Sequence, residues 1–236
     1  MRGIIVLTML AASLGHAAWN DYVEVRDLRL DAESVSELAI EAGPGSLDVR
    51  GDAAAGDIVV TATIVVSDDE DDARKRIEED LVLTLEQSGD RAVLLSRFES
   101  RRWGWGDQPA IALEVQVPER LALSVDDGSG STSIRGVRGD IDVTDGSGSL
   151  SMREVGGNLS IRDGSGSITI IDAGNDVRIV DGSGSIDIEG VGGSVIVDDG
   201  SGGIDVSDVA RDLIIEDDGS GSLRYSRIQG QVDGDT

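Results

Sequence analysis

Six aspartates open near-identical glycine-rich pentamers and are the residues of this sequence best suited to bind a cation. The pentamer reads DGSGS five times and DGSGG once, and its aspartates are Asp127, Asp145, Asp163, Asp181, Asp199 and Asp218. Nonapeptide repeats with aspartate-containing turns bind calcium in 18-residue coils. Here, however, a serine replaces the second glycine of that motif and its following aspartate is missing. We therefore favour aspartates that cap their own turns through Asx hydrogen bonds, with calcium binding as the alternative.

A second candidate site is the segment RRWGWGDQ, which lies between two β-type runs. Its candidate binding residues are Arg101, Arg102, Trp103 and Trp105. Indole rings beside guanidinium groups can bind a glycan or a partner protein, and tryptophans two residues apart share one side of an extended strand. The alternative is a hairpin tip whose indoles cover the end of a hydrophobic core, which is the interpretation we favour.

The composition argues against most catalytic chemistry. The sequence has no cysteine, and its single histidine, His16, lies in a predicted leader. The mature chain would therefore lack a histidine or cysteine for nucleophilic catalysis or for a zinc or copper site. Paired carboxylates could hydrolyse glycosides, but stacked coils place carboxylates close together automatically. We predict no catalytic residues and no cofactor other than the calcium considered above.

The charge and the first residues indicate an exported protein. Residues 1–17 combine Arg2, a short apolar run and small residues, which is typical of a signal peptide cleaved after Ala17. No segment is apolar for long enough to span a membrane. The net charge of −26 disfavours binding to nucleic acid or anionic lipid. We expect a periplasmic or cell-surface location, and an envelope protein or a surface glycan as partner.

A regular repeat must position these side chains. The pentamers begin at residues 127, 145, 163, 181, 199 and 218, so the spacing is 18 residues four times and then 19. Each 18-mer divides into two nonamers with alternating apolar and polar residues, for example around Ile168 and Ile170. Nine residues accommodate one turn and one short strand. Residues 126–236 are therefore predicted to form an all-β, parallel β-solenoid with about 18 residues per coil.

Residues 18–125 lack the strict period and are predicted to form irregular β coils continuous with the repeats. The segment Ser36–Gly51 has the pattern of a degenerate coil. The acidic start of SDDEDDARKRIEEDL, with Ser67 and Glu70 at capping-box spacing, predicts a helix over residues 68–80. A hairpin is predicted over residues 81–99.

The order of these features resembles a known bacterial family. Degenerate β coils, a helix and hairpin, the dipeptide Val117–Pro118 and Gly-Ser-Gly turns follow one another between Ser36 and Gln231. This order is similar to that of the exported β-strand-repeat proteins known as putative adhesins, a domain of unknown function. The resemblance implies a single-stranded, right-handed parallel β-helix. We expect a non-enzymatic envelope module with a structural or adhesive role, or alternatively a calcium- or glycan-binding envelope protein.

Overall fold

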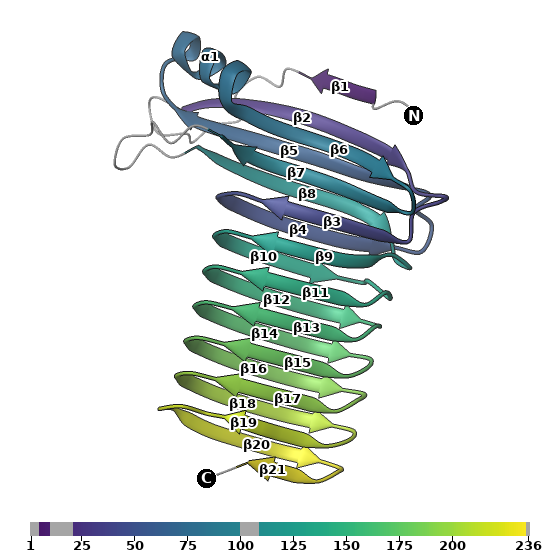
Figure 1. Ribbon diagram of the computed structural model, residues 1–236, viewed down its shortest axis with the longest axis vertical. Helices are drawn as coiled ribbons and strands as arrows, with labels where there is room; N and C mark the ends of the chain where they lie inside the picture. The colour runs from purple at the N-terminus through teal and green to yellow at the C-terminus, as the bar shows by residue number, and fades with distance from the viewer. Residues whose placement is uncertain (1–4, 10–20, 100–108, 235–236) are drawn as a thin grey trace.

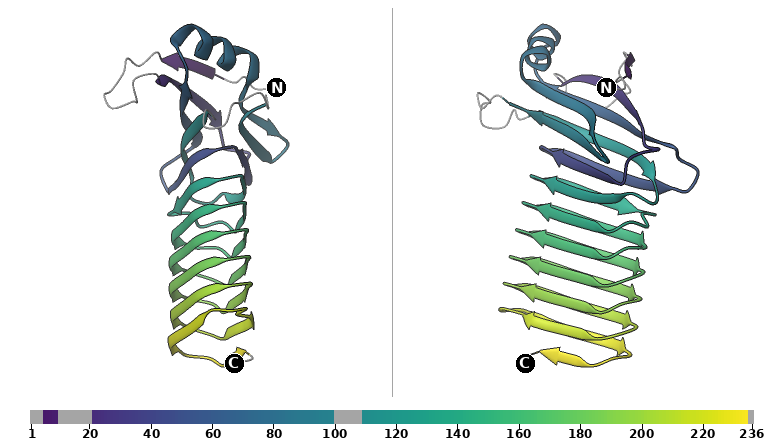
Figure 2. Two further views of the ribbon diagram at one scale, coloured as in Figure 1. Left: turned by 90° about the vertical axis from the view of Figure 1, so that its left-hand side faces the viewer. Right: turned by 45° about the vertical axis from the view of Figure 1, so that its right-hand side comes forward.

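The chain forms a stack of β coils with an antiparallel cap at one end (Figures 1 and 2). The computed structural model describes residues 5–9, 21–99 and 109–234. Their strands form two sheets: the first sheet has 11 strands in the order β1-β2-β5-β8-β4-β10-β12-β14-β16-β18-β20. The second sheet has 10 strands in the order β21-β19-β17-β15-β13-β11-β9-β3-β7-β6.

Each repeat supplies one strand to each sheet. The first sheet receives β10 (Gly130–Arg135), β12 (Gly148–Val155), β14 (Gly166–Ala173), β16 (Gly184–Val191), β18 (Gly202–Val209) and β20 (Ser222–Ile228). The second sheet receives β9 (Ala122–Asp127), β11 (Ile141–Asp145), β13 (Leu159–Asp163), β15 (Val177–Asp181), β17 (Val195–Asp199), β19 (Leu213–Asp217) and β21 (Val232–Gly234). Successive strands pair in parallel with an offset of 18 residues, as in Ile141↔Leu159, and the offset becomes 19 residues between β18 and β20 and between β19 and β21. The predicted parallel solenoid is confirmed.

The N-terminal part combines parallel coils with antiparallel strands. Strands β3 (Glu37–Ala42) and β4 (Gly45–Asp52) form a coil that pairs in parallel with β9 and β10 on one side. On its other side this coil pairs in parallel with β7 (Arg91–Phe98) and β8 (Ala110–Pro118). The strands β2 (Asp21–Asp31) and β5 (Asp57–Ser67) pair antiparallel, and β5 pairs antiparallel with β8 (Ala110–Pro118). Because β2 and β5 have 11 residues each, they are too long for a nine-residue half-coil and instead cover the end of the stack.

The edge of this cap includes part of the predicted signal peptide. Strand β1 (Ile5–Met9) pairs antiparallel with β2 and is the outermost strand of the first sheet. No other strand of the described chain depends on β1 for its pairing. Removal of residues 1–17 would therefore expose only the edge of β2, and cleavage after Ala17 stays a prediction.

A helix and a hairpin interrupt the sheets. Helix α1 (Glu70–Asp80) begins two residues later than predicted, and its N-cap is Asp69 rather than Ser67. Strands β6 (Leu81–Ser88) and β7 (Arg91–Phe98) form an antiparallel hairpin, and β7 returns the chain to the second sheet beside β3. At 11 residues, α1 is too short and too polar to cross a membrane, and no other helix occurs in the described part of the chain.

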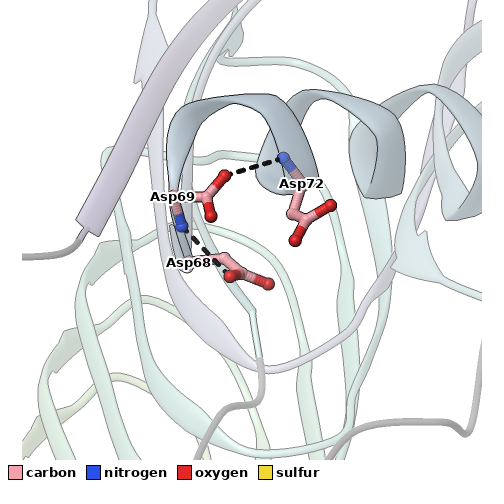
Figure 3. A group of neighbouring side chains, drawn as sticks. All are labelled: Asp68, Asp69 and Asp72. Carbon is pink, nitrogen blue, oxygen red and sulfur yellow. Dashed lines mark hydrogen bonds between the residues drawn. The ribbon is translucent and has the colours of Figure 1, made fainter.

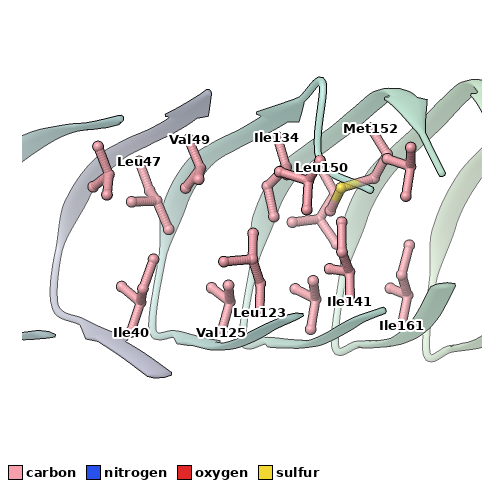
Figure 4. Packing of buried hydrophobic residues seen from close by; sticks show 14 of the residues in the cluster. Ile40, Leu47, Val49, Leu123, Val125, Ile134, Ile141, Leu150, Met152 and Ile161 are labelled. Atoms are coloured by element: carbon pink, nitrogen blue, oxygen red, sulfur yellow. The ribbon is translucent and has the colours of Figure 1, made fainter. Parts of the chain in front are cut away.

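One hydrophobic core runs from the cap into the repeats (Figure 4). Inward residues such as Ile134, Met152 and Ile170 stack one coil above the next, while the residues between them face outward. The expected alternation therefore holds through the regular coils. It fails at Tyr225, which belongs to the same column but is 50 % exposed, because no strand lies beyond β20 in the first sheet.

The second glycine of each pentamer is required by the stacking of the turns. Gly148 has φ of 143°, and a Cβ atom there would lie 1.7 Å from the carbonyl oxygen of Gly130 in the preceding coil. Any side chain would collide with backbone and would also strain the dihedral angle. The repeated glycines are thus explained by the scaffold, which leaves the aspartates as the chemically active part of the pentamer.

Candidate functional site

Five of the six predicted aspartates form a buried column, here called the aspartate column. Asp127, Asp145, Asp163, Asp181 and Asp199 each end a strand of the second sheet and pair in register with the next. Their side chains face the interior of the solenoid, and their exposure ranges from 0 % at Asp199 to 6 % at Asp163. Parallel strands are about 4.8 Å apart, so neighbouring carboxyls are separated by about that distance.

Asp218 does not join the column, although the sequence motif predicts it. The coil that precedes it has 19 residues, and the register between β17 and β19 shifts so that Asp198 pairs with Asp217. Asp217 then caps the turn by accepting a hydrogen bond from the Gly219 N–H at 2.8 Å. One inserted residue is enough to move a side chain to the other face of a strand.

Each carboxyl of the four later coils uses one oxygen to cap its turn. Oδ1 of Asp145, Asp163 and Asp181 accepts a hydrogen bond from the N–H two residues later at 3.2 Å, and Oδ1 of Asp199 does so at 3.0 Å. These are the Asx hydrogen bonds that the sequence predicts. The other oxygen, Oδ2, has no hydrogen-bond partner in any of these four residues.

In the first coil, the same oxygen accepts a hydrogen bond. The Thr132 hydroxyl donates a hydrogen bond of 2.7 Å to Oδ2 of Asp127. The residues that align with Thr132 in the following strands are aliphatic: Leu150, Ile168, Ile186 and Ile204. The absence of a donor to Oδ2 in the later coils therefore follows from one sequence position per coil.

Burial and mutual repulsion change the acidity of the aspartate column. Loss of solvation, followed by the charge of the neighbouring aspartates, raises the pKa of Asp145 and Asp181 to about 6. Loss of solvation also raises the pKa of Asp127, Asp163 and Asp199. Two carboxylates one coil apart repel by about 3.5 kcal/mol at an effective dielectric constant of about 20. Simultaneous ionisation of the whole column is thus strongly disfavoured.

The surroundings of the column do not fit calcium. Calcium takes six to eight oxygen ligands at about 2.3–2.6 Å. In the four later coils, Oδ1 already accepts a hydrogen bond from a backbone N–H. Oδ2 has no partner, and the inward residue aligned with Thr132 is leucine or isoleucine in these coils. Such a column offers an ion far too few oxygens, and we do not assign these aspartates as calcium ligands.

A separate group of acidic residues lies at the start of α1 (Figure 3). Asp69 Oδ1 accepts a hydrogen bond from the Asp72 N–H at 3.2 Å, and Asp68 forms an ion pair of 2.9 Å with Arg76. Carboxylates near a helix N-terminus satisfy free N–H groups and interact favourably with the helix dipole. The geometry of this group is therefore that of a helix cap.

The outer face of the first sheet carries a row of arginines that sequence reasoning missed. Arg50, Arg135 and Arg153 are in register on β4, β10 and β12. Arg50 forms an ion pair with Asp48 at 2.7 Å, and this contact lowers the pKa of Asp48. Among the residues that the structure describes, neither Arg135 nor Arg153 forms an ion pair. Arg50 lies outside the regular repeat, so only the observed register could reveal this arginine row.

A shallow polar hollow adjoins the arginine row. Its volume is about 570 Å³, and it lies between β4, β5, β8 and β10. The side chains around it include Arg50, Arg135, Glu114, Gln116 and Thr61. Such a mixture of donors and acceptors suits a hydroxyl-rich ligand better than a strongly anionic one.

The other predicted binding segment cannot be placed. Arg101, Arg102, Trp103 and Trp105 lie outside the described residues. Their assignment as a recognition loop or as a cover for the core therefore stays a prediction from the sequence.

Comparison with known proteins gives distant similarities in structure. No family model and no curated protein matches the sequence. A crystal structure of a "putative cell adhesion protein" from Clostridium sporogenes aligns over 90 % of this chain and 97 % of its own, with 9 % identity and a TM-score of 0.41. A "putative adhesin" from Parabacteroides distasonis aligns over 89 % of this chain and 96 % of its own, with 12 % identity and a TM-score of 0.42. Similarities of this size carry no argument about function.

Proposed function

We propose that this protein is a non-enzymatic, exported β-solenoid that acts in the cell envelope as a structural or adhesive rod. The observation that carries the proposal is the in-register pairing of successive coils, from β3 and β4 through β17 and β18. A continuous core fixes each coil to both of its neighbours. Stacked repeats of this kind form a stiff, extended surface on which side chains recur at fixed spacing.

The sequence supports export. The pattern of residues 1–17 is that of a signal peptide, and 46 acidic against 20 basic residues favour solubility. We place the mature protein in the periplasm or on the cell surface. Its partner would be another envelope protein or a surface glycan.

The arginine row is the part of the rod best suited to contact such a partner. Arg135 and Arg153 project from the outer face of the first sheet and are exposed. Arginine binds carboxylate, amide and hydroxyl oxygens through several directed N–H groups. The hollow beside Arg50 and Arg135 favours a glycan as the second candidate ligand, because its polar groups can bond to several hydroxyls at once.

The test is retention of material from the organism's own envelope fraction by the immobilised mature chain. A double variant, Arg135→Gln with Arg153→Gln, should reduce retention about tenfold. The matched control is Arg162→Gln with Arg178→Gln, which removes the same charge from the second sheet, where both arginines pair with acidic residues. Retention no greater than that of an unrelated protein of equal net charge would refute the adhesive role.

A further inference from the structure

The aspartate column has a property that the proposed function does not use. We infer that it is a proton-binding row: its four later carboxyls hold protons at pH values at which exposed carboxyls are ionised, and acidification strengthens the stack of coils. The inference rests on the geometry of Oδ2. A buried acceptor without a donor, a cation or a proton is costly, so each of these three possibilities must be considered.

A protein donor serves only the first coil. Thr132 donates to Oδ2 of Asp127, but the aligned residues beside Asp145, Asp163, Asp181 and Asp199 have no polar atom. The Oδ2 atoms of those four aspartates accept no hydrogen bond. A water molecule, a cation or a proton could still serve these four oxygens, but a water leaves the negative charges of the row in place, whereas a cation or a proton neutralises them.

The charges around the column act against an ionised row. Within the second sheet, each carboxyl is next to another member of the column above, below or on both sides. The other charged groups that act on it are Asp126 near Asp127, and Asp198, Asp217 and Asp218 near Asp199. All of them are acidic, and the facing strands of the first sheet contribute Thr132 and aliphatic residues. Among the described residues, no basic side chain acts on the column.

A proton resolves this arrangement without any other change in bonding. A proton from solvent binds to Oδ2, the carboxylate becomes a carboxylic acid, and Oδ1 keeps its hydrogen bond from the backbone. The protonated residue carries no charge, so it also lowers the repulsion on its neighbours. The protons belong to the row as a whole rather than to single residues.

The direction of the pH effect follows from the raised pKa values. In the unfolded chain an aspartate has a pKa of about 3.9, whereas the pKa of Asp145 and Asp181 in the folded protein is about 6. Between these values the folded state binds more protons than the unfolded state, so stability falls as pH rises. The stabilisation of the folded protein by the protonated row is fully present below about pH 4 and is lost as pH rises through about 6.

The experiment must separate the row from the general acidity of the chain, because any protein of net charge −26 repels itself less at low pH. Asp181→Asn removes one member of the row. Asp187→Asn removes an equal charge from the exposed face of the same coil. Ile186→Thr changes no charge and places a hydroxyl beside Asp181, at the position aligned with Thr132, whose hydroxyl donates a hydrogen bond to Asp127. The full chain is unfolded with urea at a series of pH values from 4 to 8 in a chelator-containing buffer, and again with added calcium.

We expect the unfolding midpoint of the wild-type protein to fall as pH rises from 5 to 8. The fall should be smaller in Asp181→Asn and in Ile186→Thr, and unchanged in Asp187→Asn. An infrared band of protonated carboxyl groups at pH 5.5 should be present in the wild type and weaker in Asp181→Asn, because this pH lies below the pKa of about 6 in the row and above the pKa of about 4 of exposed carboxyls. Equal pH dependence of Asp181→Asn and Asp187→Asn would overturn the inference. So would a calcium-dependent rise in the midpoint that is absent from Asp181→Asn, because the row would then hold a cation.

Discussion

The first regular coil and the four that follow it have the same backbone but satisfy a buried carboxyl in different ways. In the first coil, the hydroxyl of Thr132 donates a hydrogen bond to Oδ2 of Asp127. In the later coils, leucine or isoleucine occupies the aligned position and Oδ2 has no partner. The later coils bury more apolar surface at this position, but the charged form of their carboxyl is disfavoured because it lacks a donor.

This difference shows that a repeat can keep its geometry while its chemistry changes. The paired Cα positions of β10 and β12 align residue by residue from Gly130↔Gly148 to Arg135↔Arg153. Both coils also have the turn aspartate, Asp127 before β10 and Asp145 before β12. What differs is the single inward position opposite the other oxygen, and that position determines whether the carboxyl can be ionised at low cost.

The comparison depends on interchangeable coils, and a deletion tests this with the largest expected effect. Removal of Asp163–Val180 joins Arg162 to Asp181 and restores every inward column, so the protein should stay folded. Removal of only the first nonamer, residues 163–171, brings unlike columns into register and should abolish cooperative folding. Circular dichroism and thermal melting measure both. Similar melting of the two deletions would contradict a coil made of two nonamers.

A buried aspartate should be tolerated only at the turn. Ile170 is fully buried in the middle of β14, and the N–H groups around it belong to the sheet ladder. Ile170→Asp should therefore lower the free energy of unfolding by about 4 kcal/mol or more at pH 7.5, because no donor is available to the new charge. The control is Thr169→Asp, one residue away on the outward side, where urea unfolding should show a change below about 1 kcal/mol. Equal losses would mean that the inward and outward assignments are wrong.

The sequence predicts the repeats well because period and alternation are local signals. Every inward column from Ile141 to Leu213 follows from alternation within nine residues and from the offset of 18. The cap was harder to predict, since the long strands β2 and β5 could continue the stack or fold over it, whereas β8 does continue it by pairing in parallel with β4. The antiparallel pairing of β5 with β2 and β8 depends on contacts between residues 26 or more positions apart, for which the sequence offers no short-range pattern.

The candidate site was predicted only in part. The repeated motif identified five members of the aspartate column and the hydrogen bond to Oδ1, but not the burial of the carboxyls. In the sequence, Thr132 is simply the polar member of an apolar column, and its hydrogen bond to Asp127 depends on side-chain geometry. The motif also suggested Asp218, because a motif does not show that one extra residue shifts the register. The arginine row required the register between β4 and β10.

Removing the hydroxyl should convert the first coil into one of the later kind. Thr132→Val keeps the shape of the side chain but leaves Oδ2 of Asp127 without its donor. We expect a loss of about 1–3 kcal/mol at pH 7.5, the usual cost of an unsatisfied buried group, and a smaller loss at pH 5. Urea unfolding at the two pH values measures this. The control, Ser133→Ala on the outward side of β10, should change stability little at either pH, and a Thr132→Val variant as stable as the wild type would show that the hydroxyl is dispensable.

The smallest expected effect concerns another position at which neighbouring coils differ. Glu154 has φ of 55°, while the aligned residues of the adjacent and later coils include Gly136 with φ of 70° and Gly190 with φ of 79°. The left-handed conformation costs a residue with a side chain about 1 kcal/mol or somewhat more, and glycine adopts it freely.

Glu154→Gly should therefore raise the free energy of unfolding by about 0.5 kcal/mol, after the greater chain entropy of glycine in the unfolded state is subtracted. The control is Glu189→Gly, which removes the same charge from an exposed position of β16 where φ is not positive. That change should lower stability by about 0.5–1 kcal/mol, because glycine weakens an ordinary strand. Both variants lose one glutamate. If urea unfolding shows that Glu154→Gly is more stable and Glu189→Gly less stable than the wild type, the gain therefore comes from the backbone conformation. A gain in both variants would instead attribute it to the reduced negative charge, and the difference between the coils at this position would then have no energetic consequence.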